Sequence, residues 1–156
     1  MAPDMIFADV SQTKKSKWRK FSSEKGLENF RKNTETYSIS YNWKRNNKII
    51  QSNFTLFSES GDWVNYIYYY FSENGTLAKI ETEYRTFYGH FIAKQIIYFS
   101  PNGKMLKRNI NYYDLKKETP INTPEKWLPD NLEIMNDFSF YKTIDKLPYS
   151  HFLKTN

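Results

Sequence analysis

Residues 70–104 have the sequence YFSENGTLAKIETEYRTFYGHFIAKQIIYFSPNGK, which contains one short motif twice, as FSENG at 71–75 and FSPNG at 99–103. Asn followed by Gly is typical of a tight turn between two strands, because both residues tolerate a positive φ. Pro101 suits the second position of a type I turn, where φ lies near about −65°. The two motifs therefore predict two hairpin tips of the same kind.

The residues on either side of these tips predict β-strands. Apolar and polar residues alternate in 37–44, as Tyr37, Ile39, Tyr41 and Trp43 show, and this period of two is typical of a half-buried strand. With the turns as boundaries, further strands are expected at about 48–57, 63–71, 76–87, 90–100 and 104–114. The prediction is an antiparallel meander of six strands over residues 36–114, which the sequence leaves open to curling or to closure as a barrel.

Two of these strands differ in how their faces are composed. The strand 63–71 is apolar or aromatic at almost every position, so we expect it at the centre of the sheet with both faces covered. The strand 76–87 places Lys79, Glu81, Glu83 and Arg85 on one face. This charged row predicts either a ligand-binding face or a solvated outer face with cross-strand ion pairs.

The two ends of the chain have a different character from the middle. Residues 1–20 are basic at Lys14–Lys20 and predict a flexible arm, and 22–32 predict a short helix capped by Ser22 or Ser23. After Leu115 several prolines exclude long elements, yet the stretch is too apolar to be a free tail. We expect an arm over 1–20 and one α+β domain over 21–156, in which the segment 115–156 wraps over one face of the sheet and has helical turns near 149–153.

Composition excludes several kinds of chemistry. The chain has 156 residues, a formal net charge of +6, no cysteine and only two histidines, His90 and His151. Without cysteine it forms no disulfide, zinc ribbon, iron–sulfur cluster or cysteine nucleophile, and two histidines cannot make a three-histidine metal site. We expect no cofactor and no metal. No apolar stretch is long enough to span a membrane.

The hairpin motif and several neighbouring pieces resemble known sequences. Ser60–Trp63, Tyr70–Leu77, Arg85–Gly89, Asp114-Leu115 and Leu147-Pro148 together look like small uncharacterised bacterial proteins that are usually exported. The resemblance rests on a hairpin of the Tyr-Phe-x-x-Asn-Gly-x-Leu type and implies no activity. It implies a periplasmic or secreted protein whose signal peptide is absent from this chain. Taken by itself, the acidic stretch Met1–Val10 does not resemble a signal peptide and predicts a cytoplasmic protein.

The aromatic content is the most unusual feature, with 13 tyrosines and 12 phenylalanines. Tyrosine combines an apolar ring with a polar tip and suits binding surfaces, although it can also fill a core. We therefore expect a non-enzymatic binding or protein-interaction domain that uses an aromatic and charged sheet face. The partner is an unknown small molecule or protein. The candidate ligand-binding residues are those at strand ends beside turns, namely Trp63, Arg85, Tyr88 and His90.

Two other functions remain open from the sequence. A small hydrolase-like enzyme could use His90 as a general base, with Asp62 or Arg85 beside it. However, the chain has no serine elbow or glycine-rich phosphate loop, and no residue is assigned as catalytic. The positive charge also allows a nucleic-acid-binding protein, but that charge gathers on the N-terminal stretch rather than on the expected sheet.

Overall fold

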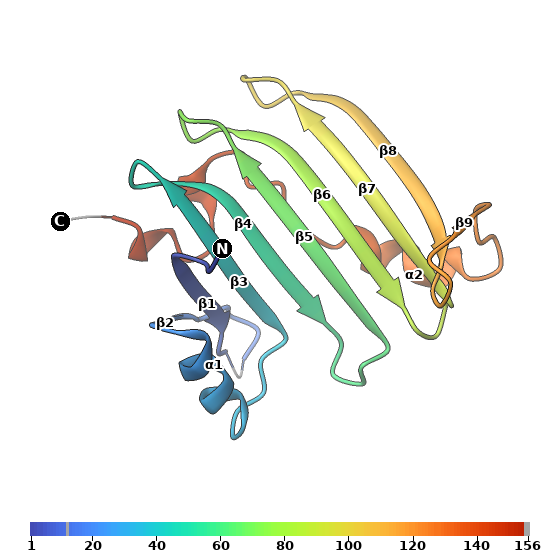
Figure 1. Ribbon diagram of the computed structural model, residues 1–156, viewed down its shortest axis with the longest axis horizontal. Coiled ribbons are helices and arrows are strands. Elements are labelled where there is room, and N and C mark those ends of the chain that lie inside the picture. The colour runs from blue at the N-terminus through green and yellow to red at the C-terminus, as the bar shows by residue number, and fades with distance from the viewer. Residues whose placement is uncertain (12, 155–156) are drawn as a thin grey trace.

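Within residues 1–11 and 13–154, the computed structural model contains one antiparallel sheet of nine strands that does not close on itself (Figure 1). The order across the sheet is β2-β1-β3-β4-β5-β6-β7-β8-β9. The strands are β1 (Met5–Asp9), β2 (Trp18–Phe21), β3 (Ser38–Arg45), β4 (Lys48–Phe57), β5 (Trp63–Phe71), β6 (Leu77–Thr86), β7 (Phe91–Phe99), β8 (Met105–Asp114) and β9 (Pro120–Ile121). The predicted α+β class is confirmed. The six strands expected over 36–114 are β3–β8, so that count was too low by β1, β2 and β9.

The two repeated motifs form matching hairpin tips. In each tip the glycine amide donates a hydrogen bond of 2.9 Å to a serine carbonyl, from Gly75 to Ser72 and from Gly103 to Ser100. The two glycines have φ values of 84° and 85°. An L side chain is strained in this left-handed region, which explains why both motifs end in glycine.

The N-terminal stretch differs from the flexible arm that the sequence analysis expects over 1–20. β1 lies inside the sheet between β2 and β3, and Phe7 and Ala8 are fully buried. Because β1 is buried on both faces, it lacks the alternation that reveals a half-buried strand. The following helix, α1 (Glu24–Arg31), begins as predicted, since the Ser23 hydroxyl accepts a hydrogen bond from the Gly26 amide at 3.1 Å.

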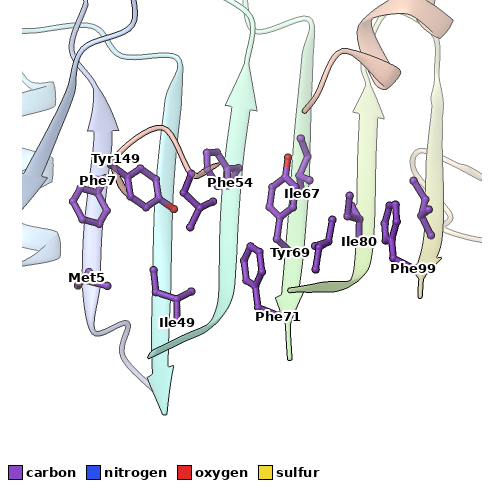
Figure 2. Close-up of a cluster of buried hydrophobic side chains, with 13 residues drawn as sticks. Met5, Phe7, Ile49, Phe54, Ile67, Tyr69, Phe71, Ile80, Phe99 and Tyr149 are labelled. Atoms are coloured by element: carbon purple, nitrogen blue, oxygen red, sulfur yellow. The ribbon is translucent and has the colours of Figure 1, made fainter. Parts of the chain in front are cut away.

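From Trp127 to Leu153 the C-terminal segment packs over one face of the sheet, whereas β9 of the same segment extends the sheet at its edge. It contains α2 (Leu128–Asn136) and two short 3₁₀ helices, η1 (Ile144–Lys146) and η2 (Ser150–Phe152). In Figure 1 this segment runs behind the strands. Figure 2 shows the core between them, in which Tyr149 of the segment lies between side chains of β1 and β4. We call this side the covered face. None of the described helices is long and apolar enough to cross a membrane.

Three tyrosine hydroxyls attach the C-terminal segment to the covered face. The hydroxyl of Tyr69 on β5 donates to the carbonyl of Ser139 at 2.7 Å. The hydroxyl of Tyr84 on β6 donates to the Asn131 side chain in α2 at 2.8 Å. The third belongs to the segment itself, because Tyr149 reaches down to polar side chains of β3. Each tyrosine therefore buries its ring and still satisfies its hydroxyl, which would be costly to leave unpaired.

The hydroxyl of Tyr149 is part of a small buried polar network. It lies 2.6 Å from the Ser40 hydroxyl and 2.7 Å from Oδ1 of Asn42, and the Ser52 hydroxyl donates to that same Oδ1 at 2.6 Å. All four residues are fully buried. Burial raises the pKa of Tyr149 to about 12. The network therefore holds the neutral phenol in one position at the bottom of the core.

The expectation that both faces of β5 are covered is wrong for one face. Asn65, Ile67, Tyr69 and Phe71 point to the covered face and are buried. Their neighbours on the opposite side are only half-buried. The central position expected for this strand is confirmed, since β5 is the middle strand of the nine.

We predict that Tyr149→Phe lowers the free energy of unfolding by about 1–3 kcal/mol, because buried acceptors lose their donor while the ring still packs. Urea unfolding followed by circular dichroism measures this change. The control is Tyr37→Phe, which removes an exposed hydrogen bond to Glu35 and should cost less than about 1 kcal/mol. Equal losses in the two variants would contradict the role given to the buried network.

Candidate functional site

Among residues 1–11 and 13–154, helix α1 covers one side of the sheet face that lies opposite the C-terminal segment. Leu27 and Phe30 of α1 pack against Ile6, Phe21 and Ile39, beside β1–β3. The strands β5–β7 extend beyond this contact and face the viewer in Figure 1. We call their outward side the tyrosine face, and define it by Tyr66, Tyr68, Tyr70, Lys79, Glu81, Glu83, Arg85, Lys94, Ile96 and Tyr98.

Three tyrosines form a row along β5 because side chains of a strand alternate between its two faces. Tyr66, Tyr68 and Tyr70 are all half-buried, each beside a charged residue of β6 in the register of the sheet. Tyr66 pairs with Glu83, Tyr68 with Glu81 and Tyr70 with Lys79. The result is a row of rings bordered by a row of charges.

The charges at one end of the row fix the position of a ring. Nζ of Lys79 lies 2.8 Å from Glu81 and 4.4 Å from the centre of the Tyr70 ring. The Tyr70 hydroxyl donates to the same carboxylate at 3.2 Å. Partial burial, followed by the charge of Glu81, raises the pKa of Tyr70 to about 12, so this phenol stays neutral and acts as a donor.

At the other end, Arg85 is held by two carboxylates. Its guanidinium lies 2.5 Å from Glu83 and 2.9 Å from Glu118 of the turn after β8. Ile92, the partner of Arg85 on β7, is fully buried although it points to this face. The long side chains around Ile92 therefore cover it. The sequence offered cross-strand ion pairs as one interpretation of the charged row. The structure contains ion pairs there, but Lys79–Glu81 and Arg85–Glu83 lie within β6, and Arg85–Glu118 joins β6 to the turn after β8.

The structure divides the four candidate ligand-binding residues between three places. Arg85 lies on the tyrosine face. Trp63 points to the opposite, covered face, where its ring lies 6.1 Å from that of Tyr84. Tyr88 and His90 lie in the turn between β6 and β7. The sequence therefore placed all four correctly near strand ends and turns, but they do not form one site.

Tyr88 and His90 come together at a residue that sequence reasoning assigned only to the C-terminal wrap. Their ring centres lie 5.5 Å and 5.8 Å from that of Trp127, and Lys126 lies 4.6 Å above the same ring. His90 has a positive φ of 59°. We call these four residues the Trp127 cluster. The sequence signal for this cluster was Trp127 itself, a large aromatic residue three positions after Pro124 in a segment that was expected to pack on the sheet.

The residues of the hydrolase hypothesis are not brought together. In residues 1–11 and 13–154, no hydrogen bond or ion pair joins His90 to Asp62 or Arg85. The Asp62 carboxylate instead accepts a hydrogen bond from Ser60 at 2.7 Å. Arg85 is engaged by its two glutamates. A base and its orienting partner need contact at about 2.6–3.2 Å, and the described residues show no such contact between these three groups.

Two cavities lie away from the tyrosine face. One of about 350 Å³ is lined by Asp9, Glu35, Thr36, Tyr37 and Glu59, among others, and one of about 390 Å³ lies between Lys48, the Asn74-Gly75 tip and the end of the chain. The described residues include no group of three or more histidine, aspartate or glutamate side chains placed to hold a metal ion.

No family profile, curated protein or solved structure matches this chain. The geometry and chemistry of the surface are therefore what bear on its function.

We predict that Gly89→Ala lowers the free energy of unfolding by about 1–3 kcal/mol and loosens the Trp127 cluster. A Cβ at this position would lie 2.6 Å from Thr86 and 3.0 Å from both Phe91 and Asn131. Urea unfolding measures stability, and the tryptophan emission spectrum reports the cluster.

The matched control is Gly26→Ala in α1, where the nearest atom to the new Cβ is at 3.4 Å. It should stabilise the protein by up to about 1 kcal/mol, because alanine restricts the unfolded chain and favours helix. If Gly89→Ala were as stable as the wild type, the close packing of this turn would be disproved.

Proposed function

We propose that the protein is a non-enzymatic interaction domain and that its tyrosine face is the surface that contacts a protein partner. The observation that carries this proposal is the row Tyr66, Tyr68 and Tyr70, left half-buried at the centre of the sheet. Aromatic rings of this kind are enriched in the centres of protein interfaces. The fourth tyrosine of the same strand, Tyr69, is buried in the core.

The position of the two cavities favours a macromolecular partner over a small ligand for the tyrosine face. Small molecules bind in concave sites that bury most of their surface. The two cavities described above lie elsewhere, and the side chains around Ile92 cover it. A face whose ion pairs are already formed suits a protein surface, because little side-chain freedom is lost on binding.

The charge of the tyrosine face argues against nucleic acid as its partner. Lys79, Arg85 and Lys94 are opposed by Glu81 and Glu83, and two of the three cations are already paired. A nucleic-acid surface concentrates positive charge where it works. Filter binding of single-stranded DNA at two salt concentrations tests this alternative, since phosphate contacts weaken steeply with salt.

We predict that Tyr66→Ser/Tyr68→Ser reduces capture of a protein partner by at least about tenfold, since an aromatic anchor contributes about 2 kcal/mol to binding. The measurement is quantitative mass spectrometry after capture from nuclease-treated extract of the source cells, with the purified pair then titrated by calorimetry.

The matched control is Phe87→Ser/Tyr88→Ser, which removes two rings that are 52% and 65% exposed in the turn between β6 and β7. It should retain the partner. The proposal is overturned if the control loses the partner and the face variant retains it. It is equally overturned if a hydrolytic activity is found that His90→Ala abolishes.

A further inference from the structure

Strand β8 forms one edge of the sheet over most of its length. β9 pairs only with Tyr112 and Tyr113, and within the described chain no strand pairs with the remainder of β8 on that side. Figure 1 shows β8 as the outermost long strand. We call residues Leu106–Asn111 the β8 edge. By contrast, the strand at the opposite edge, β2, has four residues.

The phase of the hydrogen bonds shows which backbone groups of the β8 edge point outward. The Leu115 amide donates to the His90 carbonyl at 3.3 Å, and the Asp114 amide donates to the Thr119 carbonyl at 2.9 Å. Bonded and outward-pointing residues alternate along an antiparallel strand. Tyr112 therefore directs its N–H and C=O groups toward β9. Ile110 and Arg108 have the same phase, so their N–H and C=O groups point away from β7, to the side where β9 ends and no strand follows.

The β8 edge is basic and partly apolar. Lys104, Lys107 and Arg108 are its nearest charges, and residues 104–113 contain no acidic residue. No ion pair engages these three cations in the described part of the chain, and Arg108 donates hydrogen bonds to the neutral side chains of Gln95 and Asn136. Leu106 is 63% exposed and Ile110 is 37% exposed. An exposed long edge with apolar side chains is a template for another strand.

The charge of the β8 edge decides which strand fits it. A second copy of this chain would bring a basic edge, with no acidic residue over 104–113, against an identical basic edge. Such a juxtaposition of like charge is unfavourable. An acidic strand meets no such repulsion, and its carboxylates would lie beside Lys104 and Lys107.

We propose that the β8 edge binds an extended acidic peptide segment of a partner protein as an added strand. The bound segment continues the line of β9, takes the outward hydrogen bonds of Arg108 and Ile110, and places alternate acidic side chains near Lys104 and Lys107. About six residues, spanning about 20 Å, fill the edge. This inference does not rest on the tyrosine face, because that surface lies on the flat of the sheet.

The test uses a fluorescein-labelled peptide of alternating glutamate and valine, about six residues long, titrated into the full chain at about 50 mM salt, where charge pairs are weakly screened. Two control peptides have lysine in place of glutamate, or N-methyl groups on alternate amides. The first reverses the charge and the second removes backbone donors while keeping the charge. We expect both to bind at least about tenfold more weakly than the acidic peptide.

Two protein variants locate the binding site. Ile110→Pro removes an outward N–H and leaves the hydrogen bonds to β7, which edge strands tolerate. Lys104→Glu/Lys107→Glu changes only exposed side chains, so it provides the same test if the proline variant does not fold. Each should weaken the acidic peptide at least about tenfold, and added peptide should slow hydrogen exchange of the Arg108 and Ile110 amides.

Several results would overturn the proposal. It fails if the acidic peptide does not bind, or if the lysine or N-methylated peptide binds as tightly. It also fails if light scattering shows a dimer whose β8 amides are already protected, because a second copy would then occupy the edge. Loss of peptide binding in Tyr66→Ser/Tyr68→Ser, with binding retained in Ile110→Pro, would move the peptide to the tyrosine face and leave the proposed function standing.

Discussion

The contact of Tyr149 with the sheet determines which side of this protein is core and which is surface. Its ring stacks on Phe7 at 4.1 Å with the planes 7° apart, and its hydroxyl enters the buried network of Ser40 and Asn42. Burying one aromatic side chain contributes about 1.5–3 kcal/mol, and the satisfied hydroxyl removes the penalty that would offset it. The C-terminal segment is thereby fixed to one face, and the described residues include no comparable segment over the strands β5–β7 on the other.

This one-sided cover explains why one residue type has two roles in adjacent positions. Tyr69 faces the core and uses its hydroxyl to hold Ser139 of the cover. Tyr68 and Tyr70, its neighbours in sequence, face the opposite way and are half-buried. The high tyrosine content is therefore divided between attachment of the cover, which needs a ring with a polar tip, and an open surface where such a ring suits binding.

The sequence was most informative where local chemistry decides the structure. The two Asn-Gly turns required a left-handed glycine, and the alternation in 37–44 required a strand, so both were predictable. β1 was missed because a strand buried on both faces shows no alternation, and its place between β2 and β3 depends on long-range pairing. For the candidate site, the charged row of 76–87 was visible, whereas the contact of His90 with Trp127 joins residues far apart in the chain and has no local signal.

Hydroxyl-radical footprinting with mass spectrometry tests the division into two faces most directly, because the oxidation rate follows ring exposure rather than the pKa of the phenol. The comparison is made within one strand, between Tyr69 on the covered face and Tyr68 and Tyr70 on the tyrosine face. We expect Tyr68 and Tyr70 to be oxidised at least about tenfold faster than Tyr69, which is 1% exposed, by the rule that strand side chains alternate between faces. Equal rates for the three tyrosines would mean that both faces are covered or that neither is, and would contradict this account.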